Sequence, residues 1–239
     1  MRIITVTNQK GGAGKSVLAT NLVFLAIEEK KRVLALDLDP QGSMSMVTFK
    51  GHTPQLKSSD IVSTPIDAHS LGENEFLISA VASAGLRRVV VDEKILAKNL
   101  KKYEGLIDVV IIDTAGSINT LAQAAMMCST HVVCPVEVGA YELDALLPLL
   151  ENIKTVQKQF NPKLVNLGLL PSKVYTQSAL TRSDLAMLKE SLGKRVMPHQ
   201  LSFRAAVQLS VKLKKAVWRV AKTKAAKDEW LQACKAILN

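Results

Sequence analysis

A glycine-rich segment with two lysines, Lys10-Gly11-Gly12-Ala13-Gly14-Lys15-Ser16, has the clearest chemical character in the sequence. It follows the apolar run Ile3–Val6 and precedes the apolar stretch Lys15–Glu29, so it joins an expected strand to an expected helix. Glycines let successive backbone N–H groups turn toward one point, where the helix N-terminus adds positive potential. The segment therefore predicts a phosphate cradle in which Lys15 contacts the phosphates and the Ser16 hydroxyl ligates Mg²⁺.

Three aspartates extend this prediction. Asp37, Asp39 and Asp113 stand at the carboxyl ends of apolar runs. In an open parallel sheet these ends meet at the ligand crevice. A single aspartate there is equally well explained as a helix N-cap or a turn residue. Three of them together with a phosphate loop favour a charged site.

Short apolar runs alternate with longer stretches that fit helices. The expected strands are Ile3–Val6, Val33–Leu38, Val109–Ile112, His131–Val136 and Leu164–Leu170, and the expected helices are Lys15–Glu29, Ser117–Met127, Tyr141–Gln157 and Ser178–Leu192. Continuously apolar strands are typical of a parallel sheet that helices cover on both sides. The alternation predicts a doubly wound α/β fold with a mostly parallel sheet, of the P-loop NTPase type.

Residues 50–105 have a less regular pattern. Phe76–Ser79 and Arg87–Val91 are candidate strands, and Glu93–Lys102 is a candidate helix. No internal repeat or Gly/Ser-rich linker divides the chain. The simplest prediction is one domain over residues 1–239, with a basic helical region at about 200–239.

Composition excludes several classes of protein. With 48% hydrophobic and 22% charged residues the chain is not disordered, and no apolar run approaches the roughly 20 residues of a membrane span. The N-terminus lacks the apolar core of a signal peptide. Three cysteines without a CxxC motif argue against a disulfide framework or a zinc site, so we expect a reducing cytoplasm.

The positive charge is concentrated in the last part of the chain. The net charge is +10; residues 1–150 hold 14 Lys and Arg against 16 Asp and Glu (−2), and residues 151–239 hold 17 against 5 (+12). This asymmetry indicates a polyanionic partner, either nucleic acid or an anionic membrane surface. A basic surface without a partner is the alternative.

The phosphate loop also resembles a known family. The general pattern G-x-x-x-x-G-K-[ST] would need glycine at Gln9, and the chain instead has Lys10 before its glycines. KGGAGKS resembles the deviant Walker A box of the ParA/MinD ATPases, DLDPQG at 37–42 is similar to their second phosphate-site box, and VVIIDTAG at 109–116 resembles their Walker B strand and switch. The Asn8-Gln9 lead-in and the Asp-Pro-Gln-Gly sequence resemble the ParA partition branch more than the MinD branch. Because the first expected strand begins so near residue 1, we expect a small ParA-type partition ATPase without an N-terminal helix-turn-helix domain. The resemblance covers most of the chain except about residues 45–105.

The resemblance implies ATP and Mg²⁺ as cofactors and a homodimer with ATP. Asp39 would orient the attacking water, Asp113 would hold the Mg²⁺ shell through water, and Asp37 would support the site. Lys10 would reach the phosphates of the partner copy, as an arginine finger does. The implied catalytic residues are Lys10, Lys15 and Asp39, the nucleotide-binding residues are Lys10, Gly11, Gly12, Ala13, Gly14, Lys15, Ser16 and Val17, and the metal site is Ser16 with Asp39 and Asp113 acting through water.

Two parts of the nucleotide site are less clear. Val17 stands where many relatives have a second hydroxyl residue, so one contact to the α-phosphate, worth about 1 kcal/mol, is expected to be missing. By resemblance, Pro171 in Pro171–Lys173 and Pro198 in Val196–Pro198 flank the adenine. Both segments are equally well explained as ordinary proline-containing loops.

The basic C-terminal region predicts a DNA-binding surface. Residues 200–239 hold nine Lys and Arg against Asp228 and Glu229, a net charge of +7, with apolar residues near helical spacing. In the family such a surface on the ATP-bound dimer binds DNA without sequence preference, and phosphate contacts need no base-reading motif. The candidates are Arg182, Arg204, Lys212, Lys214, Lys215, Arg219, Lys222 and Lys224. Lys214–Arg219 is more basic than in many relatives, and a solvated lysine face is the alternative.

These inferences predict a P-loop ATPase that is weak alone and stimulated by a ParB-like adaptor in plasmid or chromosome partition, cytoplasmic and nucleoid-associated. A relative that positions a conjugation, secretion or chemotaxis complex is an alternative, as are an ATPase like the nitrogenase iron protein and a non-enzymatic DNA-binding module. A membrane-associated MinD-like ATPase is less well supported, because Trp230–Asn239 contains one basic residue and no Phe/Leu-rich tail. We expect that segment to be a packed helix.

Overall fold

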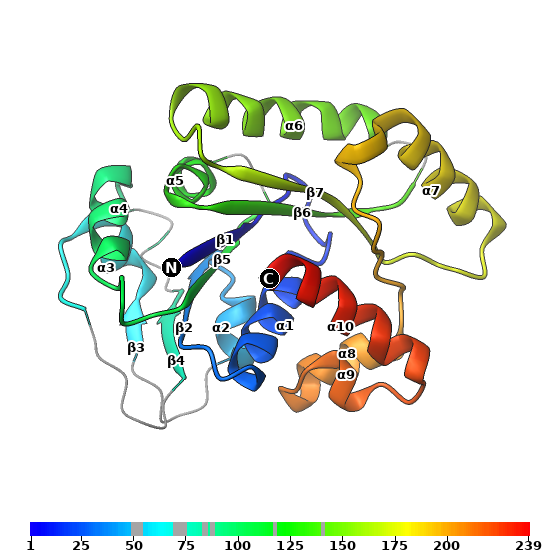
Figure 1. Cartoon of the computed structure of the whole chain (residues 1–239), viewed down its shortest axis with the longest axis horizontal. Coiled ribbons are helices and arrows are strands. Elements are labelled where there is room, and N and C mark those ends of the chain that lie inside the picture. Colours follow the sequence, from blue (N-terminus) through cyan, green and yellow to red (C-terminus); the bar gives the residue numbers. More distant parts are fainter. Residues whose placement is uncertain (49–54, 69–75, 83–85, 87–88, 117–118, 140–141) are drawn as a thin grey trace.

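A central parallel sheet forms the middle layer of the computed structural model (Figure 1). The structure describes residues 1–48, 55–68, 76–82, 86, 89–116, 119–139 and 142–239. The seven strands lie in the order β3-β4-β2-β5-β1-β6-β7, and every strand pairing is parallel. They span Arg2–Val6 (β1), Val33–Leu38 (β2), Gln55–Lys57 (β3), Leu77–Val81 (β4), Val109–Thr114 (β5), His131–Glu137 (β6) and Val165–Ser172 (β7). The predicted parallel α/β fold is confirmed.

The helices lie on both faces of the sheet. They span Lys15–Glu28 (α1), Ser43–Thr48 (α2), Ser58–Ser63 (α3), Glu93–Lys101 (α4), Thr120–Cys128 (α5), Glu142–Gln159 (α6), Ala179–Leu192 (α7), Ala205–Leu213 (α8), Val217–Val220 (α9) and Lys224–Leu238 (α10), with a 3₁₀ turn at Gly193–Arg195. In Figure 1, α1 and α10 lie on one side of the sheet and α5 and α6 on the other. The predicted helices 15–29, 117–127, 141–157 and 178–192 correspond to α1, α5, α6 and α7, within the described residues.

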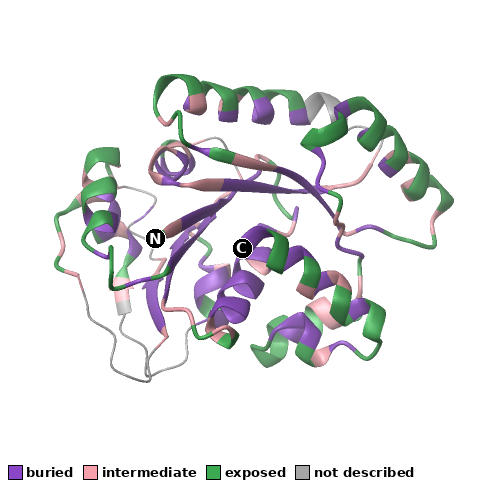
Figure 2. Ribbon diagram, viewed as in Figure 1, coloured by how far each residue is buried: buried purple, intermediate pink, exposed green. Residues whose placement is uncertain are grey.

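Alternating strand residues serve two cores. On the α1 side, Ile4 and Ile111 pack with buried residues of α1 and α10, whereas Ile3 and Ile112 pack with α4 and α5 on the other face. Figure 2 shows the strands and α1 buried along most of their length. Residues of β6 form a third cluster with α6 and α7. This two-sided burial explains why the strands are continuously apolar.

The middle of the chain differs most from expectation. The candidate strand Phe76–Ser79 corresponds to β4 and the candidate helix Glu93–Lys102 to α4. The candidate strand Arg87–Val91 is wrong where it is described, because Val89–Val91 lie outside any strand, and residues 87–88 lie outside the described residues. The short elements α2, β3 and α3 were not predicted.

The connections place the phosphate loop at a change of direction in the sheet. The chain leaves β1 through residues 7–14 and α1 toward β2 on one side, and β6 and β7 lie on the other side of β1. In open α/β sheets the ligand crevice lies at such a point, at the carboxyl ends of the strands. In the described part of the chain, no helix has the length and hydropathy to cross a membrane.

Candidate nucleotide-binding site

The loop between β1 and α1 has the backbone geometry of a phosphate cradle. Gly12 and Gly14 have φ angles of 78° and 91°, a left-handed region that favours glycine. Gly14 immediately precedes α1, so the first free N–H groups of that helix face the loop. The Ser172 hydroxyl at the end of β7 donates a 2.7 Å hydrogen bond to the carbonyl of Ala13 and ties the loop to the sheet.

The switch segment after β5 closes tightly on this loop. A Cβ placed on Gly116 would lie 2.9 Å from the Gly11 nitrogen and 3.0 Å from its Cα. Both are backbone atoms, so a side chain at residue 116 would displace the loop. Contact between the Walker B segment and the phosphate loop therefore requires glycine at this position.

Lys15 is the buried cation of the loop. It is 5% exposed, and its Nζ donates to the carbonyl oxygen of Lys10 at 3.1 Å. Burial lowers the pKa of Lys15, and the carboxylates of Asp113 and Asp39 oppose that shift. The ammonium is thus held where it can bind an anion.

Asp37 has a structural role at the end of β2. Its fully buried carboxylate accepts hydrogen bonds from the Ser45 N–H at 2.8 Å, the Ser45 hydroxyl at 2.7 Å and the Asp39 N–H at 3.1 Å. The Ser45 oxygen in turn accepts from the Ala82 N–H at 3.2 Å, beyond β4. Asp37 therefore holds α2 and the segment that carries Asp39.

Asp113 is equally buried but differently surrounded. Its exposed fraction is 0%, and neither carboxylate oxygen has a partner with full hydrogen-bond geometry among the described residues. Burial raises the pKa of Asp113 well above its usual range and the Asp37 charge adds to the rise, whereas the nearby Ser16 hydroxyl and, to a smaller extent, the Lys15 ammonium oppose it. Buried charged groups are normally paired, so these oxygens indicate a site completed by a cation or its water shell.

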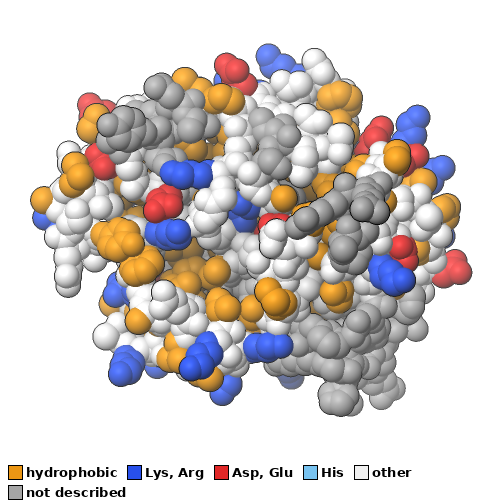
Figure 3. Space-filling model, turned by 180° about the vertical axis from the view of Figure 1, so that it is seen from behind, with side chains coloured by type: hydrophobic (Ala, Val, Ile, Leu, Met, Phe, Trp, Pro, Cys, Tyr) orange, Lys and Arg blue, Asp and Glu red, His pale blue; other side chains and the backbone are white. Residues whose placement is uncertain are grey.

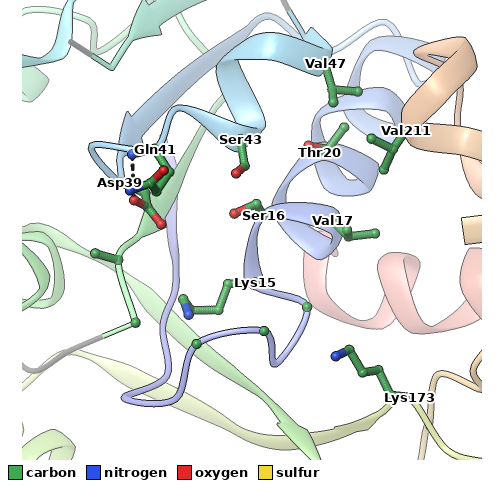
Figure 4. A pocket seen from close by; sticks show the side chains of 15 residues that line it. Lys15, Ser16, Val17, Thr20, Asp39, Gln41, Ser43, Val47, Lys173 and Val211 are labelled. Atoms are coloured by element: carbon green, nitrogen blue, oxygen red, sulfur yellow. Dashed lines mark hydrogen bonds between the residues drawn. The ribbon is translucent and has the colours of Figure 1, made fainter. Parts of the chain in front are cut away.

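Asp39 reaches the same space from the segment after β2. It is half-buried, and its Oδ1 accepts from the Gln41 N–H at 2.9 Å. Asp39, Ser16 and Ser43 extend into the pocket from one side of the loop in Figure 4, whereas Lys173 approaches from the opposite side. Lys10, on the outer part of the loop, is exposed.

The donor set fits Mg²⁺ held largely by oxygen ligands and water. Among the described residues, no group of three or more His, Cys, Asp or Glu side chains could hold a metal ion by itself. Mg²⁺ commonly uses one or two carboxylates, substrate phosphates and several waters. The Ser16 hydroxyl and the unpartnered Asp113 carboxylate are consistent with that arrangement.

Two adjoining cavities follow the loop. The larger, about 630 Å³, is lined by the loop glycines, Lys15, Ser16 and Asp39. The smaller, about 270 Å³, lies against Ser172, Leu201, Arg204 and Trp230, among others. Within the part of the chain that the structure describes, Arg204 Nε and Trp230 Nε1 are buried donors without a hydrogen-bond partner. Two donors in a partly apolar pocket could bind a nucleotide base.

Neither predicted adenine contact, Pro171 or Pro198, is among the described lining residues of this cavity. Pro171 lies within β7, and its carbonyl accepts from the Leu201 N–H at 2.8 Å. Pro198 is exposed. Ser172 and Lys173 of the first predicted segment line the cavity, whereas no residue of Val196–Pro198 is among its described lining.

The predicted DNA-binding residues divide into groups. Arg204, Lys212 and Lys222 line one cavity of about 780 Å³ between α8 and α10. Lys214, Lys215 and Lys224 are exposed. Figure 3 shows Lys and Arg side chains along the lower edge of the face that it displays. Three of these cations, Lys212, Arg219 and Lys224, lie on α8, α9 and α10, and four more lie in the segments that flank these helices, Arg204, Lys214, Lys215 and Lys222.

Three arginines among the candidates have protein partners. Arg219 Nε donates to Glu28 at 2.8 Å, and Arg204 lies 3.5 Å from Glu229. Arg182 lies apart on α7 and donates to the Thr176 carbonyl at 2.8 Å. The exposed lysines are the more accessible cations.

The basic helices are fastened to the helix of the phosphate loop. The buried Asn21 side chain in α1 accepts from the Val217 N–H at 2.8 Å. Glu28 accepts from Trp218 Nε1 at 3.0 Å as well as from Arg219. The apolar side of α10, including Trp230, packs in the same core as α1, which confirms the expected packed helix. The helix α1, which begins at the phosphate loop, therefore also holds α9 and α10 in place.

Sequence reasoning missed several residues of this site. Ser43, Ser45 and Thr20 line or support it, but hydroxyl residues are too common to be recognised without their partners. The role of Gly116 was not predicted although its segment was recognised, because its contact with Gly11 joins the segments that follow two different strands.

The family model and the relatives that this chain resembles agree with one another. A family model described as an AAA domain matches residues 1–166. The IncC protein of Escherichia coli is 28% identical over 236 residues, 95% of this chain, and the chain spans 65% of its length. The chromosome-partitioning ATPase Soj of Thermus thermophilus is 30% identical over 208 residues, covering 82% of this chain and 79% of Soj.

The fold also extends to other activities. Cobyrinic acid a,c-diamide synthase from Mycobacterium smegmatis, solved with bound ADP and magnesium, is similar over 100% of this chain and 94% of its own. The TM-score is 0.78 and the sequence identity 23%. This likeness shows the shared fold and leaves the function to be argued from the site.

Proposed function

The chain belongs to the ParA/MinD family of ATPases, and on that premise we propose that it is a Mg·ATP-dependent partition ATPase that pairs with a second copy and binds DNA without sequence preference. The observation that carries the nucleotide part is the buried, unpartnered Asp113 carboxylate beside Lys15 and the phosphate loop. A lysine that can bind phosphate, next to a buried carboxylate that can act on a metal ion through water, is what a phosphate–magnesium pair requires.

Each side chain has a task in this proposal. The loop N–H groups and Lys15 bind the phosphates, and Ser16, together with Asp113 acting through water, holds the metal. Mg²⁺ supplies positive charge against the developing phosphate charge. Asp39 orients the attacking water. The Asp37 carboxylate keeps Asp39 in place by accepting a hydrogen bond from the Asp39 backbone N–H. Lys10 reaches the phosphates of the partner copy, where added charge favours hydrolysis.

The DNA-binding surface is assigned to α8, α9 and α10. Exposed lysines there can contact phosphates, and release of counterions favours such binding on any sequence. Because Asn21 and Glu28 fasten α9 to α1, a change in the helix that begins at the loop is transmitted to the basic surface. Pairing also doubles the number of cations that meet one duplex.

In this proposal residues 1–239 act as one P-loop ATPase domain with a basic helical region at about 200–239. A ParB-like adaptor bound to the cargo stimulates hydrolysis, which separates the pair and releases DNA. The protein would then be cytoplasmic and nucleoid-associated. The cargo is a plasmid or a chromosome.

An ATP-dependent gel shift on random-sequence duplex DNA tests the proposal. We expect a shift with Mg·ATP and none with ADP or without nucleotide. The logarithm of the affinity should fall with the logarithm of salt concentration, with a slope of about −0.9 per phosphate contacted. DNA binding that ignores nucleotide or salt would refute the proposed switch.

A further inference from the structure

Lys173 lies at the junction of the two cavities beside the phosphate loop. Three residues, Gly14, Val17 and Lys173, line both cavities. Gly14 has no side chain, and the Val17 side chain has no polar atom. Among these three, Lys173 is therefore the residue whose side chain can bind an anion that crosses the junction.

The Lys173 side chain approaches the loop closely. A Cβ placed on Gly12 would lie 3.7 Å from Lys173 Nζ, which puts the ammonium beside the loop backbone. Figure 4 shows this side chain extending toward the loop from the side opposite Asp39. The Lys173 backbone has a φ of 53°, a left-handed conformation that residues with side chains adopt infrequently. Such conformations are often found at ligand sites.

The existing partner of Lys173 is a weak one. Its Nζ lies 3.6 Å from Glu137 Oε2, and the two side chains are 37% and 34% exposed. Partly exposed ion pairs of this kind contribute little to stability and are readily exchanged. The ammonium can therefore turn from Glu137 to a phosphate at small cost.

A nucleotide that fills both cavities must cross this junction. With its terminal phosphates at Lys15 and its base near Trp230, the α-phosphate and the sugar lie between them. We propose that Lys173 binds the α-phosphate of the nucleotide held by its own chain. This inference rests on the proposed function, because it requires a nucleotide in the site.

The test compares the affinities of three variants for Mg·ADP and for magnesium with a non-hydrolysable ATP analogue, by titration calorimetry. Lys173→Met removes the charge and keeps the length, and Lys173→Arg keeps the charge. Lys30→Met is the control, since Lys30 is a lysine whose φ is also positive, 58°, but it is exposed and lies beyond the far end of α1. Thermal melting checks that each variant is folded.

We expect Lys173→Met to weaken both nucleotides by the same factor, about tenfold, the loss typical of one charge-assisted hydrogen bond. Lys173→Arg should retain most of the affinity, and Lys30→Met should match the parent chain. Unchanged affinity in Lys173→Met would overturn the inference and leave the proposed function intact. A loss for the ATP analogue alone would also overturn it, because Lys173 would then contact the terminal phosphate. A parent chain that binds neither nucleotide would refute the proposed function as well.

Discussion

Asp37 and Asp113 stand opposite each other in the register of β2 and β5, both fully buried, yet among the described residues only Asp37 has partners with full hydrogen-bond geometry. The two aspartates, on the neighbouring strands β2 and β5, therefore have different roles. Asp37 organises the chain after β2, and Asp113 presents two unpaired oxygens to the site. Like charges held this close are unfavourable, so the arrangement costs stability that a bound cation would recover.

The first prediction concerns the stability of the nucleotide-free protein. Because the pKa of Asp113 is raised in the fold, the folded chain binds that proton more tightly than the unfolded chain does. Stability therefore falls as the pH rises above the ordinary aspartate pKa, by about 1.4 kcal/mol per unit of raised pKa. Asp113→Asn should raise the melting temperature, and more at pH 8 than at pH 5.

Asp37→Asn provides the contrast in the same melting experiment. It removes a charged acceptor of the Ser45 N–H and hydroxyl, so it should destabilise the protein by about 1–2 kcal/mol. If the two substitutions shifted the melting temperature alike, the division of tasks between the two aspartates would be wrong.

Lys15→Ala should abolish Mg·ATP binding. The substitution removes the buried ammonium that opposes the charges of Asp113 and Asp39. We expect at least about a 100-fold loss of affinity, measured by equilibrium dialysis with labelled nucleotide. Lys30→Ala, at the opposite end of α1, is the control. Nearly normal binding by Lys15→Ala would contradict the assignment of the phosphate site.

Asp39→Ala should separate binding from hydrolysis. Asp39 lines the larger cavity, where it would act on water and not on the phosphate chain. Nucleotide affinity should change little, whereas hydrolysis in a single turnover should slow by about 100-fold or more. A variant that hydrolyses ATP at the parent rate would remove Asp39 from the mechanism.

Trp230 should report occupation of the smaller cavity. Its indole lines that cavity, and its Nε1 has no hydrogen-bond partner. In a Trp218→Phe background Trp230 is the one remaining tryptophan, since the sequence has two. We expect adenine nucleotides to change its fluorescence and inorganic triphosphate to leave it unchanged. Equal responses to both would place the base elsewhere.

Charge removal on the C-terminal helices should weaken DNA binding without affecting nucleotide binding. Lys212→Ala with Lys222→Ala removes two exposed cations that line one cavity. The salt slope of DNA affinity should become shallower by about one unit per lysine that contacts a phosphate. Lys163→Ala with Lys189→Ala changes the net charge equally, away from α8–α10, and should have no such effect.

Which strands and helices could be predicted from the sequence depended on their length and on how many of their faces are buried. Strands buried on both faces, such as Val33–Leu38, carry a continuous apolar signal and were predicted at their observed bounds. The short elements α2, β3 and α3 contain three to six residues, too few to show a period. Val89–Val91 are all β-branched, but they lie outside any strand in the described structure, so β propensity alone did not decide their conformation.

The parts of the site that could be predicted are those whose residues lie close together in the sequence or directly follow an apolar run. Lys10–Ser16 form one continuous segment, and the aspartates end apolar runs. Contacts between distant segments were not predictable, because no spacing encodes them. Examples are the hydrogen bond from Ser172 to Ala13, the approach of Lys173 to Gly12, and the ion pair of Arg219 with Glu28.

Sedimentation velocity tests the central claim, that a nucleotide at Lys15 and Asp113 makes the chain pair with a second copy. With magnesium and a non-hydrolysable ATP analogue we expect the 26.0 kDa species to be replaced by one of twice that mass. The same sample with ADP, and a Lys10→Ala variant with the analogue, should stay at the smaller size. A parent chain that remains a single 26.0 kDa species at saturating analogue would contradict the account.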